Sequence, residues 1–312
     1  MFDTELKDIN FEVENNVSLC IDNAEKKYMS SVENIADRLE TSGAKIVLLA
    51  GPSGSGKTTT ANILRDYLSS KGHETVVISM DNFYRAINDP LYPRDESGAL
   101  DYESVYALDT DKIHDCLSGL LCGKAVKIPK YVFGKGVSVP DAIPISLNKG
   151  GFVIIEGIHA LNPIICDGLD RHRIIKLFIS VSTNINDNGK RLISGKKIRF
   201  IRRLTRDSLY RGTDAASTLE RWSSVLAGEN KYLYPYKDTA DLKINTFHIY
   251  ELGLMKKFAQ KAIKESEREL SGEYIEIVKH ALSKFSEVDL EKIPQTSLIR
   301  EFVPGGKYEN LY

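Results

Sequence analysis

Gly51-Pro52-Ser53-Gly54-Ser55-Gly56-Lys57-Thr58 decides the fold of this chain, because it contains every fixed position of a phosphate-binding loop. An apolar run at residues 45–50 precedes the loop, and residues 59–70 carry apolar side chains at helical spacing. The loop therefore lies between a buried strand and a helix N-terminus, as its mechanism requires. There, backbone N–H groups wrap phosphates, the lysine neutralises the outer phosphates and the threonine hydroxyl binds Mg²⁺.

Composition bounds the function classes. The chain has 312 residues, of which 42% are hydrophobic, enough for one large α/β domain with additions or for two small domains. Its 42 basic and 43 acidic residues give a net charge of −1, which argues against a general nucleic-acid or membrane-surface binder. The 4 cysteines form no CxxC pair and no zinc spacing, so we expect reduced thiols in a cytoplasmic protein. No apolar run approaches the roughly 18 residues that span a bilayer, and no signal peptide is expected.

The strand and helix patterns alternate along the chain. Besides the strand before the loop, we expect strands at 74–80, 151–157, 174–179 and 240–245. Helices are expected at 59–70, 109–121, 197–210, 216–228, 250–270 and 273–285. This alternation predicts an α/β fold of the P-loop NTPase type, with a doubly wound, mostly parallel sheet and helices on both faces. Ligands should then bind beyond the carboxyl ends of the strands.

The same patterns suggest three parts of the chain. Residues 1–43 form an N-terminal helical extension, with the helical pattern clearest at 32–39. Residues 44–248 form the P-loop domain, which includes a polar connection at 81–108, a small β excursion at 125–147 and a helical lid at about 190–212. Residues 249–312 supply C-terminal helices and a tail packed on that domain.

Two acidic residues follow predicted strands. Glu156 comes after four apolar residues, where a carboxylate is costly to bury unless a cation compensates, and in a phosphate-loop protein that cation is Mg²⁺. Asp81 follows the strand at 74–80, and phosphoryl transfer to a hydroxyl needs a carboxylate that orients and deprotonates the acceptor. The structural alternatives are a helix cap for Glu156 and a turn cap for Asp81.

Arginines line one face of the predicted helix at 197–210. Arg199, Arg202, Arg203 and Arg206 are spaced 0, +3, +4 and +7, and Arg211 follows just before Gly212. Such a stripe is usually a solvated helix face. Beside a phosphate loop, however, guanidinium groups fit phosphate oxygens and stabilise the charge that develops during transfer, and a closing lid would supply them.

Aromatic residues gather in the segments near the predicted crevice, and together they could stack on a planar base. Each one separately could equally well pack in the core. They are Phe83, Tyr84, Tyr102, Tyr131 and Phe133.

Six stretches of sequence, in order, resemble the uridine kinase/phosphoribulokinase family of P-loop kinases, over about residues 44–248. They are GPSGSGKTT, SMDNFY, IPKYVF, VIIEGIHALNP, RRLTRDSLYRG and KDTADLKIN. The likeness is closer to the bacterial nucleoside (uridine) kinase branch, through PRDESGALDYESVYALD, RWSSVLAGENKYLYPY and IPQTSLIREFVPGG.

The resemblance implies ATP and Mg²⁺ as cofactors and assigns site residues. Catalysis would fall to Asp81, Lys57 and Arg206, and the metal would be held by Thr58 and Glu156. The acceptor would contact Asp81, Tyr84, Asp109, Tyr131 and Arg206. The nucleotide would bind to Gly51, Ser53, Gly54, Ser55, Gly56, Lys57, Thr58, Thr59, Arg203 and Arg211.

The resemblance also has departures. Well-studied uridine kinases carry a histidine soon after the aromatic pair matching Tyr131 and Phe133, whereas Gly134-Lys135-Gly136 follows here. A lid arginine is replaced by Thr213, and residues 184–198 are longer. These departures bear on the choice of acceptor and leave phosphoryl transfer in place.

The expected function is therefore ATP- and Mg²⁺-dependent transfer to a small-molecule hydroxyl, above all the 5′-hydroxyl of a nucleoside. The alternatives are a kinase of another hydroxyl metabolite, such as a sugar phosphate, a pantothenate-like acid or a polyol, a nucleotide-dependent regulatory ATPase, or a degenerate kinase kept as a binding module. The implied partner is a small molecule, with no nucleic acid and no membrane, and family analogy adds a homo-oligomer.

Overall fold

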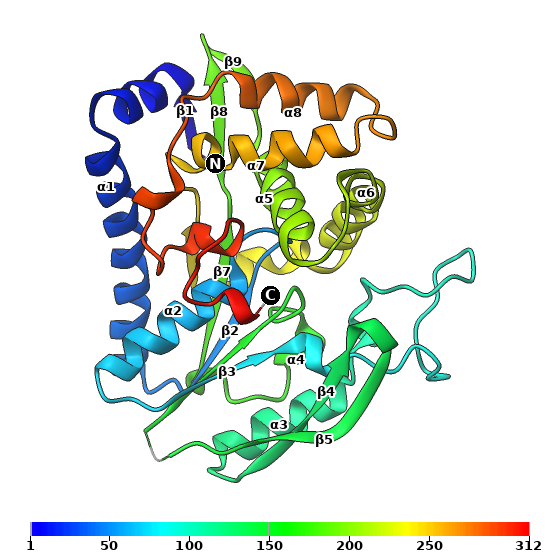
Figure 1. The fold of residues 1–312 in the computed structure, drawn as a ribbon. Coiled ribbons are helices and arrows are strands. Elements are labelled where there is room, and N and C mark those ends of the chain that lie inside the picture. The colour runs from blue at the N-terminus through cyan, green and yellow to red at the C-terminus, as the bar shows by residue number, and fades with distance from the viewer. Residues whose placement is uncertain (1, 149, 312) are drawn as a thin grey trace.

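A five-stranded parallel sheet forms the centre of the molecule in the computed structural model, which describes residues 2–148 and 150–311 (Figure 1). The strand order is β10-β7-β2-β6-β3. The strands are β2 (Ile46–Ala50), β3 (Thr75–Ser79), β6 (Phe152–Glu156), β7 (Ile174–Ser180) and β10 (Leu242–Asn245). The predicted parallel sheet and its P-loop NTPase-type fold are thus confirmed.

Helices cover both faces of this sheet because successive strand residues point to opposite sides. In β2, Val47 and Leu49 belong to a core shared with α1, α2, α5 and α7, whereas Ile46 and Leu48 belong to a second core shared with α3. The bounds are α2 (Lys57–Ser70), α3 (Thr110–Leu121), α4 (Pro163–Cys166), α5 (Gly195–Tyr210), α6 (Ala215–Tyr232), α7 (Glu251–Glu265) and α8 (Glu273–Ser283).

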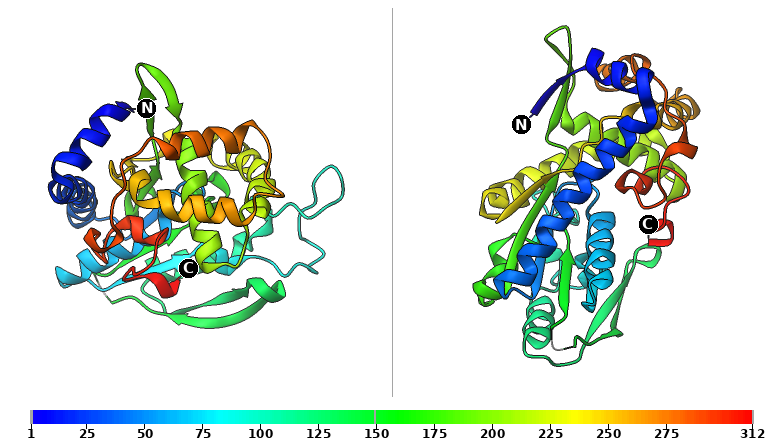
Figure 2. Two further views of the ribbon diagram at one scale, coloured as in Figure 1. Left: turned by 45° about the horizontal axis from the view of Figure 1, so that its top comes forward. Right: turned by 90° about the vertical axis from the view of Figure 1, so that its left-hand side faces the viewer.

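The N-terminal segment is more ordered than its sequence suggested. Helix α1 (Leu6–Ser42) begins far earlier than the pattern at 32–39, with a break at Asn16 where φ is −157° and ψ is 81°. It runs along one side of the molecule and contacts α2 (Figure 2). Before it, β1 (Phe2–Glu5) pairs in parallel with β8 (Thr183–Asp187), which turns back into β9 (Lys190–Ile193). The longer segment at 184–198 is therefore mostly this hairpin.

The β excursion predicted at 125–147 is an antiparallel hairpin of β4 (Val126–Val132) and β5 (Val137–Ile145). The connection at 81–108 holds short 3₁₀ turns at Met80–Phe83 and Val105–Ala107 and isolated antiparallel bridges between Tyr84 and Leu108 and between Arg94 and Leu100. Among the described residues, no helix is both long and apolar enough to cross a membrane.

Helix α5 does not carry its arginines as one solvated stripe. Arg199 and Arg202 are fully buried, where Arg199 forms a bidentate pair with Glu229 of α6 at 2.7 and 2.8 Å. Arg202 pairs with Glu251 of α7 at 2.5 Å. The remaining arginines of the stripe, Arg203 and Arg206, line a cavity beside the phosphate loop. Two of the four stripe positions therefore fix α5 to its neighbouring helices.

The buried pair of Arg202 and Glu251 gives a stability prediction. We expect Glu251→Ala to lower the free energy of unfolding by about 3–5 kcal/mol, because it leaves a fully buried guanidinium without its counter-charge. Urea denaturation followed by circular dichroism measures this change. The matched control is Glu265→Ala in the exposed pair with Lys261, where we expect a change within about 0.5 kcal/mol. Equal effects of the two variants would contradict the assignment.

Candidate active site

The phosphate-binding loop leaves β2 and enters α2 through glycines whose backbone conformation would be strained for any other residue. Gly54 has φ +72°, and a Cβ there would lie 2.7 Å from the carbonyl oxygen of Arg199. Gly56 has φ +90°, and its Cβ would lie 2.9 Å from Cδ1 of Leu298. Residues other than glycine rarely adopt this left-handed backbone conformation. The loop is therefore held between α5 on one side and the C-terminal segment on the other.

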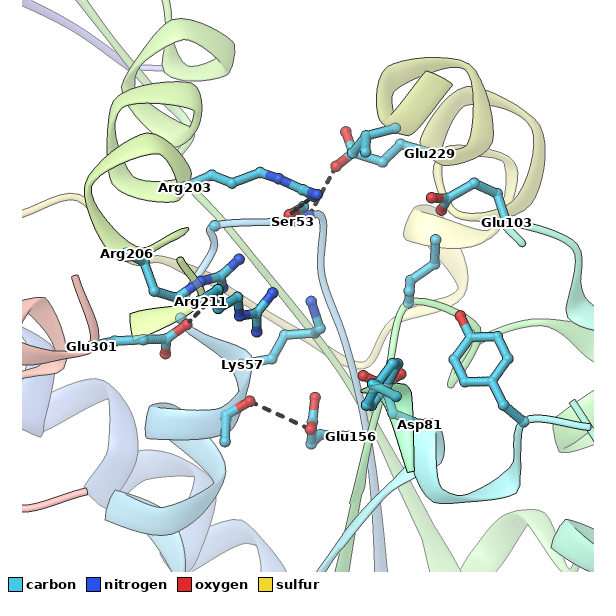
Figure 3. A pocket seen from close by; sticks show the side chains of 18 residues that line it. Ser53, Lys57, Asp81, Glu103, Glu156, Arg203, Arg206, Arg211, Glu229 and Glu301 are labelled. Atoms are coloured by element: carbon cyan, nitrogen blue, oxygen red, sulfur yellow. Dashed lines mark hydrogen bonds and ion pairs between the residues drawn. The ribbon is translucent and has the colours of Figure 1, made fainter. Parts of the chain in front are cut away.

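A cavity of about 270 Å³ opens beside this loop, at the carboxyl ends of β3 and β6. All three residues assigned to catalysis from the sequence line it, and Figure 3 shows Lys57 in its centre with Asp81 and Glu156 nearby. The predicted site residues among the lining are Ser53, Gly54, Gly56, Lys57, Thr58, Asp81, Tyr84, Glu156, Arg203, Arg206 and Arg211.

The two strand-end carboxyls have perturbed acidities. Burial raises the pKa of Glu156 to about 7, although Lys57 opposes the shift, and the neighbouring Asp81 adds to it. Solvent reaches Asp81 inside the cavity, but the surrounding protein still desolvates it and raises its pKa, against the attraction of Lys57, Arg211 and Arg206. Carboxyls with raised pKa values at a cleft are suited to acid–base or metal chemistry near neutral pH.

These oxygen atoms suit a magnesium ion. The Thr58 hydroxyl lies 3.4 Å from Oε1 of Glu156, and Asp81 lies close enough to raise the pKa of Glu156. Mg²⁺ prefers oxygen ligands and is commonly held by one or two carboxylates plus substrate phosphates. A cation at this point would also compensate the desolvated carboxylates. The residues present therefore fit the group that the sequence predicts.

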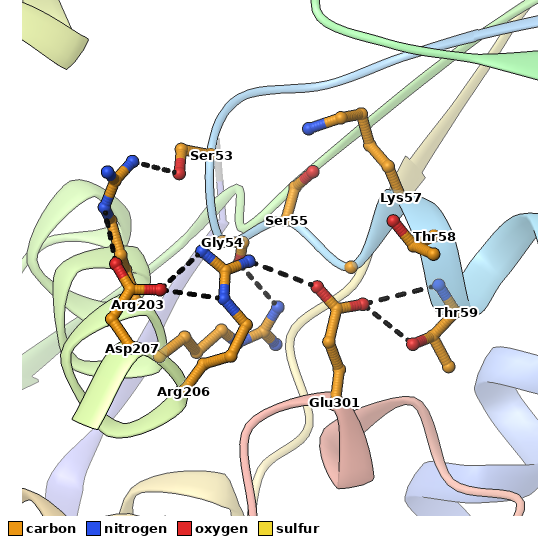
Figure 4. A network of polar contacts seen from close by, with 12 residues as sticks. Ser53, Gly54, Ser55, Lys57, Thr58, Thr59, Arg203, Arg206, Asp207 and Glu301 are labelled. Atoms are coloured by element: carbon orange, nitrogen blue, oxygen red, sulfur yellow. Dashed lines mark hydrogen bonds and ion pairs between the residues drawn. The ribbon is translucent and has the colours of Figure 1, made fainter. Parts of the chain in front are cut away.

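One carboxylate organises the arginines of the cavity. Asp207 pairs with Arg203 at 3.2 Å, with Arg206 at 3.0 Å and with Arg211 at 3.6 Å, and Figure 4 shows it beside Arg203 and Arg206. Desolvation lowers the pKa values of Arg203 and Arg211, and the neighbouring Arg206 lowers them further. These guanidinium groups remain charged. Asp207 thus holds three cations together where phosphates would enter.

Sequence reasoning assigned no role to several acidic residues of the site. Asp207 lies four residues after Arg203, so helical spacing could have revealed it. Glu103, from the long connection, lines the cavity, and burial raises its pKa to about 7. Glu229 accepts a hydrogen bond from the Ser53 N–H at 2.8 Å. Glu301 of the C-terminal segment also lines the cavity. No sequence spacing connects these last three residues to the loop.

An aromatic cavity of about 390 Å³ adjoins the first one. The two cavities share Tyr84 and Phe133, and the second adds Tyr131, whose ring centre lies 5.5 Å from that of Tyr84. Its other walls are Ile87, Tyr92, Tyr102, Gly134, Lys135 and Gly136. The first cavity, called the phosphate cavity below, therefore borders a second space lined by aromatic rings, the aromatic cavity.

Asp109 lies apart from both cavities. Its carboxylate caps α3 by accepting from the Lys112 N–H at 3.1 Å, and it lies 4.0 Å from Arg85. It lines neither of the two cavities. Asp109 is therefore the N-cap of α3, whereas its predicted contact with the acceptor stays a prediction. The other assigned roles also stay predictions, although the structure brings those side chains together.

Residues 46–251 match the model of the Phosphoribulokinase / Uridine kinase family. The chain belongs to this family. A uridine kinase of Staphylococcus aureus (strain JH9) is 29% identical over 201 residues, covering 64% of this chain and 86% of the relative. Among solved structures, a possible uridine kinase from Bacillus stearothermophilus is similar, with a TM-score of 0.40, 18% identity and coverage of 49% of this chain and 80% of that one. D-glycerate 3-kinase from Cryptococcus neoformans has a TM-score of 0.34, 15% identity and 87% coverage of both chains.

Membership of this family makes the chain a kinase that transfers a phosphoryl group to a hydroxyl, in a family that generally uses ATP and Mg²⁺. The matched range ends at Glu251, the first residue of α7. It contains the phosphate loop, both strand-end carboxylates and the three arginines. Helix α1 and the segment that supplies Glu301 lie outside it.

The acidity of Glu156 predicts how magnesium binding depends on pH. Since this carboxyl has a pKa of about 7 without metal, a proton occupies it below that pH and competes with Mg²⁺. We expect the apparent affinity for Mg²⁺, measured calorimetrically in the presence of ADP, to fall about tenfold from about pH 8 to about pH 6. Glu156→Gln should lose most of this dependence. An affinity in the unaltered protein that is flat over this range would contradict the assignment.

Proposed function

We propose that this kinase transfers the γ-phosphoryl group of ATP to the 5′-hydroxyl of a nucleoside, with Mg²⁺. The observation that supports a nucleoside as acceptor is the aromatic cavity, which shares the side chains of Tyr84 and Phe133 with the phosphate cavity. A planar base can stack between such rings while the sugar reaches toward the phosphates. The 29% identity with a uridine kinase supports the same class of acceptor.

The residues of the phosphate cavity have complementary roles in this reaction. Lys57 and the loop N–H groups hold the β- and γ-phosphates, and Thr58 with Glu156 would hold Mg²⁺, which neutralises phosphate charge when bound. The hydroxyl oxygen of the acceptor attacks the γ-phosphorus of ATP while Asp81 accepts the hydroxyl proton. The bond between the γ-phosphorus and the oxygen that bridges it to the β-phosphate breaks, and ADP leaves. Arg203, Arg206 and Arg211 stabilise the charge on the transferring group.

Closure of the site around the donor would change the partners of the arginines. With the cavity as it stands, Arg206 donates to Asp207 at 3.0 and 3.1 Å, so its charge is compensated before phosphates arrive. Binding of a triphosphate offers stronger, bidentate partners to the same guanidinium groups. In the proposed mechanism, guanidinium groups already at the cavity wall exchange Asp207 for the phosphates when the donor binds.

An ADP-release assay with Mg²⁺-ATP and a panel of acceptors tests the function. The panel contains uridine, cytidine, purine nucleosides, ribulose 5-phosphate, pantothenate and inositol. We expect release that depends on a nucleoside, and at least about 100-fold slower turnover in Asp81→Asn with ATP binding unchanged, the scale of general-base losses. ADP release that occurs only with a non-nucleoside would show that the acceptor is that compound and not a nucleoside. Release without any acceptor would instead favour a regulatory ATPase.

The aromatic cavity gives a separate prediction for acceptor binding. We expect Tyr131→Ala to raise the KM for the nucleoside about tenfold or more, because stacking of a base on an aromatic ring contributes about 1–3 kcal/mol. The KM for ATP should stay within about twofold, since Tyr131 does not line the phosphate cavity. The control is Tyr106→Ala, an exposed tyrosine outside both cavities. A rise confined to the KM for ATP would reject this cavity as the acceptor site.

A further inference from the structure

The C-terminal segment, residues 294–306, packs directly on the phosphate loop although it lies outside the matched family range. Leu298 is fully buried against Gly56, and Phe302 lies under the guanidinium of Arg202, 5.0 Å from the ring centre. Figure 1 shows this segment, coloured red, close to α1 and α2. The apolar side chains of the segment are part of the main core.

Polar contacts fix the position of this segment at several points. Ser297 donates to Glu25 of α1 at 2.7 Å. Arg300, itself nearly buried, donates to the carbonyl oxygens of Ile293 at 2.6 Å and Leu290 at 2.9 Å. Tyr308, just beyond the segment, donates to Asp66 of α2 at 2.8 Å. The residue between Arg300 and Phe302, Glu301, is therefore held in a defined place.

Glu301 directs its carboxylate at the anion-binding end of α2. Its Oε2 accepts from the Thr59 hydroxyl at 2.7 Å and from the Thr59 N–H at 3.4 Å, while Oε1 lies 3.6 Å from Nη1 of Arg206 (Figure 4). Only 3% of the residue is exposed. N–H groups in the first turn of such a helix bind phosphates. A carboxylate of the chain itself thus uses donors that suit a nucleotide phosphate.

The position of Glu301 relative to Asp81 indicates which phosphates of the donor would lie at Thr59. The two carboxylates lie on opposite sides of Lys57 in Figure 3. The γ-phosphate must face the acceptor beside Asp81, so the rest of the donor must leave the loop toward Thr59 and Glu301. The cavity there measures about 270 Å³ and also has to admit the acceptor hydroxyl. This volume is slightly below the range of about 300–1,000 Å³ that sites for small ligands usually enclose.

We propose that Glu301 is a built-in competitor of the donor nucleotide: its carboxylate must leave Thr59 before the inner phosphates of ATP or ADP can bind there. The C-terminal segment thereby sets the nucleotide affinity of a site whose remaining residues belong to the family domain. This inference rests on the proposed use of ATP as donor. It is distinct from a purely structural role, in which Glu301 would only cap α2.

The two roles of Glu301, competitor of the nucleotide or cap of α2, predict opposite changes in the affinity for ADP when Glu301 loses its charge. Glu301→Gln keeps the shape and a hydrogen-bond acceptor for Thr59 but removes the negative charge. We expect it to bind Mg²⁺-ADP about tenfold more tightly by isothermal titration calorimetry, equivalent to about 1.4 kcal/mol. Glu301→Ala, which also removes the acceptor, should bind ADP at least as tightly as Glu301→Gln. Glu291→Gln changes an exposed glutamate of the same region and should leave the affinity unchanged.

Unchanged or weaker binding of ADP in both Glu301 variants would overturn the proposal, because a cap that merely orders α2 gives that result. The acceptor assay distinguishes a failure of this inference about Glu301 from a failure of the proposed kinase function. If the unaltered protein phosphorylates an acceptor with ATP while both variants bind ADP no more tightly, only the inference about Glu301 fails. If neither the unaltered protein nor the variants bind ADP, the proposed donor fails, and the inference fails with it.

Discussion

The site depends on the close packing of α5 against the phosphate loop. The backbone of the helix approaches Gly54 so closely that no side chain fits there. Two buried guanidinium groups complete the contact, as Arg199 donates to the carbonyl oxygen of Ser53 at 2.8 Å and Arg202 to that of Gly54 at 3.3 Å. Each is compensated by a buried glutamate, so a wrong orientation of α5 would leave charges unpaired in the core. The loop and the helix are thereby fixed as one unit.

This constraint determines the electrostatics of the cavity. With Arg199 and Arg202 facing inward, Arg203 and Arg206 of the same helix face the cavity and join Lys57 there. Asp207 pairs with both guanidinium groups and holds them at the cavity wall before phosphates bind. Carboxylates occupy the opposite wall, at the ends of β3 and β6. Guanidinium groups, a lysine and carboxylates thus meet within one small space.

Much of this arrangement could be predicted from the sequence, because the decisive contacts are local. The phosphate loop, the strands that end at Asp81 and Glu156, and the helical spacing of the arginines each lie within a short stretch whose pattern carries its own mechanism. Their meeting at one sheet edge follows from the parallel topology. What spacing could not show is which arginines of the stripe face the core, since that depends on Glu229 and Glu251 in other helices.

The parts that the sequence did not reveal depend on contacts between distant segments. Glu301 reaches Thr59 across 242 positions of the chain, and the stretch IPQTSLIREFVPGG, which contains Glu301, does not indicate that contact by its spacing. Strand β1 is short and has no alternating apolar pattern, so only its pairing with β8 identifies it. The resemblance assigns Asp109 to the acceptor; in the structure it caps α3, and its contact with an acceptor stays a prediction. Local patterns located the strands, helices and loop of the site, whereas contacts between distant segments had no local pattern to reveal them.

The central claim is that the donor phosphates lie between Lys57 and the arginines of α5 while the acceptor occupies the aromatic cavity. A crystal structure with Mg²⁺, uridine and a non-hydrolysable ATP analogue tests it most directly. The account predicts the γ-phosphate against Lys57, the 5′-hydroxyl within hydrogen-bonding distance of Asp81, and the base between Tyr84 and Tyr131. A nucleoside bound elsewhere, or a γ-phosphate directed away from Asp81, would contradict it.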